Sequence, residues 1–129
     1  LLSWLFIQQK EYEKAFVQEK ALFNRNPTDV SMIFELGEIA FEDKNYETAE
    51  NCFQFIVEKT SLTEDKISAN LYLVKIAIAT KNPETTKLFD KLFNEFGINP
   101  ATINLQVAYA DFLTFQKNNP EKAIEILGI

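Results

Sequence analysis

The chain has no histidine and only one cysteine, Cys52. The absence of histidine excludes the commonest general base, the serine–histidine and cysteine–histidine nucleophile pairs, and most zinc sites. One cysteine excludes an internal disulfide and does not distinguish a reducing from an oxidising compartment. Cys52 lies beside Phe53 on an expected helix, where we expect it either to pack against its neighbours or to be mildly exposed. We therefore expect no enzyme activity.

Glycine and proline are scarce too, with 3 and 4 copies in 129 residues. So few helix breakers favour helices over a turn-rich β fold. A hydrophobic content of 47% and a charged content of 25% are ordinary for a folded protein, and the length is sufficient for one core. We therefore predict one all-α domain over residues 1–129.

Basic residues number 13 against 19 acidic ones, for a net charge of −6. No basic stripe is present to displace counterions from phosphates, which argues against nucleic acid as a partner. The sequence also has no glycine-rich phosphate loop and no nucleophile elbow. The adjacent carboxylates at 42–43 and 64–65 do not face each other as a glycosidase pair would, and helix ends explain them equally well. We expect no cofactor and no metal.

An internal period is visible when KEYEKAFVQEKALFNRNP, residues 10–27, is aligned with KNYETAENCFQFIVEKTS, residues 44–61. The offset is 34 residues, and residues of the same type recur at it. The matched pairs are Tyr12 with Tyr46, Ala15 with Ala49, Leu22 with Ile56, Leu2 with Leu36, and Ser3 with Gly37.

This pattern resembles the tetratricopeptide repeat, a helix–turn–helix unit of about 34 residues. The second unit matches it best, and the first has Glu19 where the pattern has an aromatic residue. The later units are more divergent, because Ala49, Thr86 and Ala123 follow one another at 37 residues. Asn-Pro pairs at 82–83, 99–100 and 119–120 predict helix starts, and Gly97 is expected to end a helix. The expected units are 1–27, 28–61, 62–98 and 99–129, the first and last truncated.

The resemblance implies antiparallel helix pairs stacked as a right-handed α-solenoid. It also implies that the first helix of each pair lines a concave groove, which holds an extended or helical segment of a partner protein. The Lys, Asn and Arg clamp with which one subfamily binds acidic tails is missing. The expected groove-facing residues are Trp4, Ile7, Gln8, Phe34, Glu35, Glu38, Phe41, Glu42, Leu71, Lys75 and Ile78.

Glu35, Glu38 and Glu42 are spaced so that their carboxylates share one helix face. Two interpretations stay open: a strip that attracts a basic or amide-rich partner segment, or an ordinary solvated face. A metal site is disfavoured, because three carboxylates on one straight helix do not converge on one ion.

The apolar opening, LLSWLFI, is too short to span a bilayer, which takes about 20 residues. It also lacks the flanks of a signal peptide, and it aligns with the second half of a first helix. We therefore expect a piece of a longer repeat protein, cytoplasmic or periplasmic, since any leader would lie upstream of residue 1. The leading hypothesis is a non-catalytic scaffold for protein–protein interaction, with self-association through apolar repeat ends. The alternative is an accessory or assembly domain of a larger enzyme, secretion or envelope complex, with no exchangeable ligand.

Overall fold

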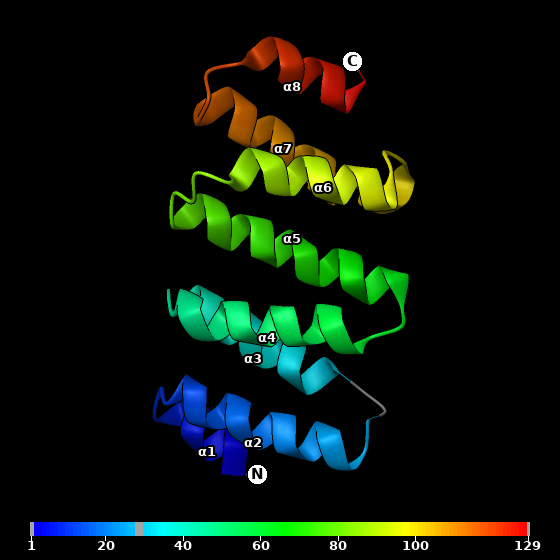
Figure 1. Ribbon diagram of the computed structural model, residues 1–129. Coiled ribbons are helices and arrows are strands. Elements are labelled where there is room, and N and C mark those ends of the chain that lie inside the picture. The colour runs from blue at the N-terminus through cyan, green and yellow to red at the C-terminus, as the bar shows by residue number, and fades with distance from the viewer. Residues whose placement is uncertain (1, 28–29, 129) are drawn as a thin grey trace. The chain divides into compact units, whose positions relative to one another are not determined.

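The computed structural model describes residues 2–27 and 30–128, and within these ranges it contains helices and no strands. The prediction of an all-α protein is therefore confirmed (Figure 1). In chain order the elements are α1 (Leu2–Gln8), α2 (Tyr12–Arg25), α3 (Ser31–Glu42), α4 (Tyr46–Lys59), α5 (Thr63–Ala79), α6 (Thr85–Phe96), the short 3₁₀ helix η1 (Pro100–Thr102), α7 (Ile103–Phe115) and α8 (Pro120–Leu127).

The chain forms two compact units, residues 1–76 and 77–129, and the division falls inside α5. In unit 1, α1 packs on α2 and α3 packs on α4, while α2 also contacts both α3 and α4. In unit 2, α7 packs on α8. Of the helices in the described ranges, none has both the length and the apolar composition to cross a membrane.

Four turns between helices share a left-handed residue, and in three of them the closing hydrogen bond also spans the same five residues, whereas in the fourth it spans six. Each contains one residue with a left-handed backbone, and the next residue donates its N–H to a carbonyl near the end of the preceding helix. Three of these left-handed residues are lysines, although such a backbone favours glycine. The left-handed residues are Lys10, Lys44, Lys81 and Asn118, with φ of 60°, 60°, 56° and 52°. The hydrogen bonds run from Glu11 to Phe6 (2.8 Å), Asn45 to Ala40 (2.8 Å), Asn82 to Ala77 (2.9 Å) and Asn119 to Leu113 (2.7 Å).

The residue after the left-handed position also begins the next helix in three of the turns. Glu11, Asn45 and Asn119 are the N-caps of α2, α4 and α8, and the last two accept a backbone N–H through their side chains. The prediction of Asn119 as a cap followed by proline is confirmed. At the Asn82–Pro83 pair the prediction is wrong in detail, since Glu84 is the N-cap and α6 begins only at Thr85. The side chain of Asn82 instead accepts the N–H of Glu84, which extends the turn.

The core of unit 1 combines small residues with aromatic rings. Ala15 and Ala49, one repeat apart, are fully buried and allow their helices to approach closely. Phe53 lies directly on Gly37, where an added Cβ would be 2.8 Å from the ring carbon Cζ. The buried residues of this core are Tyr12, Ala15, Phe16, Ile33, Leu36, Ala40, Ala49, Cys52, Phe53, Phe55, Ile56, Ala69, Leu73 and Ile76.

Unit 2 is organised around Phe89 of α6 and Tyr109 of α7, whose rings stack at 4.6 Å. Thr102 is fully buried at the start of α7, where its hydroxyl and Asn99 form a capping box. Gly97 ends α6 with φ of 81°, as predicted. Ala123 is buried in α8, so the small residue expected at this position packs inside the unit.

Candidate functional site

The expected binding face begins on α1, where three residues of the predicted groove lie. Trp4 is half exposed, at 50% of its surface, and Gln8 is exposed. Ile7 is partly buried against the core of unit 1. The exposed indole makes Trp4 available to a partner and also to a fluorescence measurement.

The three glutamates of α3 differ in their solvent exposure. Glu35 and Glu42 are exposed, whereas Glu38 is partly buried. The Tyr72 hydroxyl of α5 donates a hydrogen bond of 2.8 Å to the Glu38 carboxylate. Glu38 therefore has a structural partner, and Glu35 and Glu42 provide the more accessible charge of the three.

Phe34 and Phe41 are partly buried in an aromatic cluster and do not project freely from α3. Both make edge-to-face contacts with Tyr72, at 5.6 Å and 5.5 Å between ring centroids. Phe34 also packs on Phe53, and Tyr72 stacks on Phe53 at 4.6 Å. These two phenylalanines thus fix α5 against α3 and form the floor of the expected face.

The three predicted residues on α5 also differ in their solvent exposure. Lys75 is exposed, and its ammonium lies 5.0 Å from the centre of the Tyr72 ring. Leu71 is partly buried beside Tyr72 in sequence, and Ile78 is partly buried on the last turn, in the part of α5 that belongs to unit 2. Tyr72 therefore contacts both predicted residues, Glu38 through its hydroxyl and Lys75 through its ring.

Tyr72 was missed by sequence reasoning, although it connects the α3 and α5 members of the predicted face. Burial raises the pKa of Tyr72 to about 12, with further contributions from the hydrogen bond to Glu38 and the charges of Glu38 and Glu42. The sequence did contain a signal for Tyr72. It lies 37 residues after Glu35, a predicted residue of the face, and the same spacing separates the left-handed turn residues Lys44 and Lys81, so Tyr72 occupies the position equivalent to Glu35.

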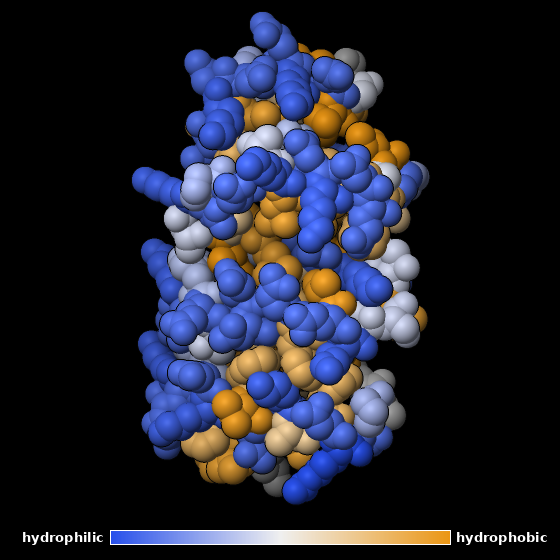
Figure 2. All heavy atoms as spheres, in the orientation of Figure 1, coloured by the Kyte–Doolittle hydropathy of each residue, from blue (hydrophilic) through white to orange (hydrophobic). Residues whose placement is uncertain are grey.

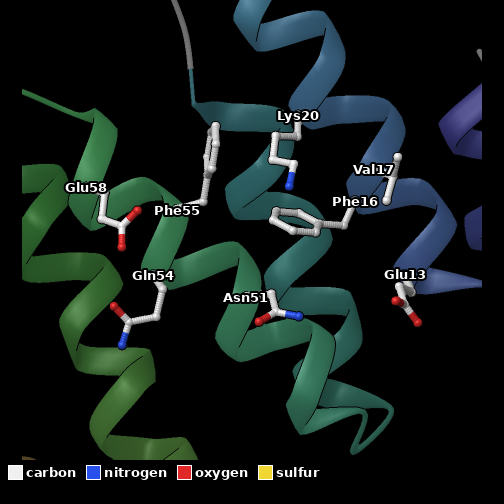
Figure 3. Close-up of a pocket in the computed structure, with 8 residues that line it drawn as sticks. All are labelled: Glu13, Phe16, Val17, Lys20, Asn51, Gln54, Phe55 and Glu58. Carbon is white, nitrogen blue, oxygen red and sulfur yellow. The ribbon is translucent and has the colours of Figure 1, made fainter.

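A second surface feature is a hollow of about 380 Å³ between α2 and α4 (Figure 3). The rings of Phe16 and Phe55 meet edge to face in it, 6.0 Å apart. The ammonium of Lys20 lies 5.1 Å from the centre of the Phe16 ring. Its lining residues are Glu13, Phe16, Val17, Lys20, Asn51, Gln54, Phe55 and Glu58.

The hollow belongs to the second helices of the first two pairs. In the view of Figure 1, α2 and α4 lie in front of α1 and α3. Over this face of unit 1, hydrophilic residues predominate and apolar atoms show between them (Figure 2). Because the resemblance directed attention to the first helices, none of the lining residues was predicted as a binding residue.

Neither surface presents a reactive group. Cys52 is fully buried, and burial raises the pKa of its thiol to about 12, so the nucleophilic thiolate is disfavoured. Across residues 2–27 and 30–128, no three His, Cys, Asp or Glu side chains are grouped as a metal site requires. What these surfaces offer chemically is burial, hydrogen bonding and charge.

Comparison of the chain with known protein families, with curated proteins and with solved structures finds no match. A functional interpretation therefore depends on the geometry of the helix pairs and of the two surfaces. The left-handed residue that recurs in the four turns is the most specific of these features.

Proposed function

We propose that this chain is a tetratricopeptide-like helical repeat that binds a segment of a partner protein without catalysis. The observation that carries the proposal is the recurrence of a left-handed turn residue at spacings of 34, 37 and 37 residues, at Lys10, Lys44, Lys81 and Asn118. Repeated helix pairs of this length bury their apolar faces by stacking and offer extended surfaces for partners. A right-handed solenoid is the arrangement we expect from such stacking.

The binding face in this proposal is made by the first helices of the pairs. Three features support it: Trp4 is exposed on α1, the carboxylates of Glu35 and Glu42 are exposed on α3, and an aromatic floor lies beneath the α3 residues. An exposed indole supplies apolar contact area. The carboxylates favour a partner segment that is basic or rich in amides.

The test begins with a pull-down from the native organism, followed by affinity measurements on the captured partner. In the variant Glu35→Gln/Glu38→Gln/Glu42→Gln we expect about tenfold weaker binding at low salt, since exposed ion pairs each contribute up to about 1 kcal/mol. The difference should shrink at high salt because salt screens exposed charges.

A matched control carries the same change in charge on other helices. The variant Glu95→Gln/Glu121→Gln/Glu125→Gln alters three exposed carboxylates of α6 and α8 and should bind as the wild type does. Equal affinity in both variants and the wild type would refute the acidic face. If no exchangeable partner is captured and Trp4 emission does not respond to the native extract, the accessory or assembly role becomes the better interpretation.

A further inference from the structure

We propose that the hollow between α2 and α4 is a second binding site, for an extended peptide segment that carries an apolar side chain flanked by Lys or Arg. It lies on the second helices of the first two pairs, and the proposal is independent of the face made by α1, α3 and α5. The hollow provides a ring-lined seat, two amide side chains and two carboxylates (Figure 3).

The apolar seat is formed by Phe16, Phe55 and Val17. Both rings are nearly buried, yet their edges line a space of about 380 Å³, while Val17 is 57% exposed. That volume is at the small end of ligand pockets, which suits a single large side chain. An aliphatic or aromatic group placed there would cover apolar surface that is now in contact with water.

The amide groups suit a peptide backbone. Asn51 and Gln54 are exposed, lie one turn apart on α4 and line the same hollow. Each side chain carries both a carbonyl acceptor and an NH₂ donor, so each can pair with the N–H and C=O of an extended chain. Such pairing does not depend on the sequence of the segment, whereas the ring-lined seat and the carboxylates do select among sequences.

The charge of the rim selects a cationic segment. Glu13 and Glu58 line the hollow from α2 and α4, and neither belongs to any ion pair among the described residues. Glu47 and Glu50 add two exposed carboxylates to α4. The one cation of the lining, Lys20, is placed over the Phe16 ring. The ammonium of Lys59 lies 5.9 Å from the centre of the Phe55 ring. An arginine or lysine of the partner therefore gains unpaired carboxylates and competes with Lys20 and Lys59 for the two rings.

The experiment titrates short peptides into ¹⁵N-labelled protein and follows the side-chain NH₂ signals of Asn51 and Gln54. The probes are acetyl-Arg-Leu-Arg-amide and its counterparts with Glu or Gln in place of both arginines. We expect saturable shifts of both signals with the arginine peptide at millimolar concentration or below. The glutamate and glutamine peptides should leave these signals unmoved at the same concentration.

Three variants locate the site on residues outside the buried core: Glu13, Val17 and Glu58 are exposed, and Lys20 is partly buried. Glu13→Gln/Glu58→Gln should weaken arginine-peptide binding about fivefold or more, and Val17→Lys should abolish it. Lys20→Ala should strengthen it, because the ring is then free for the peptide's cation. Val107→Lys, an equal change at an exposed valine of α7, should have no effect.

Several outcomes would overturn the proposal. Absence of saturable shifts at Asn51 and Gln54 is one, and equal binding of the glutamine peptide is another. If the arginine peptide instead shifts the backbone amide signals of Glu35 and Glu42, the α3 face binds it and the hollow does not. The triple glutamine variant of α3 separates the two sites, since it should not change binding at the hollow.

Discussion

Ser3 donates a hydrogen bond to the carboxylate of Glu19 at the place where, 34 residues later, Phe53 lies against Gly37. Both members of the first pair are buried, with 3% and 8% of their surfaces exposed. The first helix pair thus replaces a ring-on-glycine contact by a buried polar contact. Equivalent positions of the two helix pairs are therefore in contact in both, through a hydrogen bond in the first pair and through apolar packing in the second.

Removing one member of the polar pair should destabilise the protein. Ser3→Ala leaves the buried Glu19 carboxylate without its donor, a loss of about 1–3 kcal/mol. Glu19→Phe alone should also destabilise, since the ring would meet the Ser3 hydroxyl. The double variant Ser3→Gly/Glu19→Phe recreates the Gly37–Phe53 contact, and we expect it to be more stable than Glu19→Phe. Urea unfolding measures each loss, and the wild type, Ser3→Gly, Glu19→Phe and the double variant together give the coupling; additive effects would contradict this account.

Gly37→Ala should destabilise the protein although alanine is the better helix former. The added Cβ would lie 2.8 Å from Phe53 Cζ and 3.1 Å from Cys52 Cβ. Phe53 has no room to move, because it is fully buried and stacks on Tyr72. We expect a loss of about 1–3 kcal/mol, measured by denaturant unfolding. Phe53→Leu should reduce the penalty of Gly37→Ala if the ring is its cause, and an unchanged penalty would refute that assignment.

The free energy of unfolding should fall between pH 10 and pH 12. The pKa of Tyr72 is about 12 in the fold against 10.0 for the free side chain, with burial as the main cause. The neutral hydroxyl therefore stabilises the fold below pH 10, and this contribution is lost as the pH rises towards 12. Tyr72→Phe should flatten the decline. Tyrosine ¹³Cζ signals, followed residue by residue, measure the pKa directly, and Glu38→Gln should lower it.

Lys44→Gly should stabilise the protein by up to about 1 kcal/mol, because glycine adopts the left-handed backbone without strain. Lys44 has φ of 60° and is exposed, so its side chain contributes little packing. Lys44→Val should have the opposite effect, since a β-branched residue is most strained there. Thermal unfolding of the two variants gives the comparison. Lys91→Gly, at an exposed position in the interior of α6, serves as a control that should destabilise.

The helix pairs and their turns were accessible from sequence because they follow a period. The 34-residue offset aligned Tyr12 with Tyr46 and Ala15 with Ala49, and both alanines are buried. Capping chemistry is local, so Gly97 and Asn119 were placed correctly. The start of α6 was not, because the Asn82 side chain bonds the N–H of Glu84 before the helix begins.

The surfaces were harder to foresee, for a geometric reason. The hollow depends on Phe16 and Phe55, and the residues one repeat away from them are Glu50 and Ala21. It therefore has no repeat signal, and only the side-by-side packing of α2 and α4 creates it. In α3, helix periodicity placed the three glutamates on one face but did not reveal that Tyr72 binds Glu38.

The sharing of a single residue between consecutive helices has a consequence for how the chain opens. Asn45 closes the end of α3 through its N–H and caps α4 through its side chain, and Asn119 does the same for α7 and α8. Fraying of either helix releases a hydrogen bond of the other, so amide exchange should report the two helices of a pair opening together. We therefore expect α3 with α4, and α7 with α8, each to open as one cooperative unit, whereas α5 and α6 share no such residue because Glu84 caps α6.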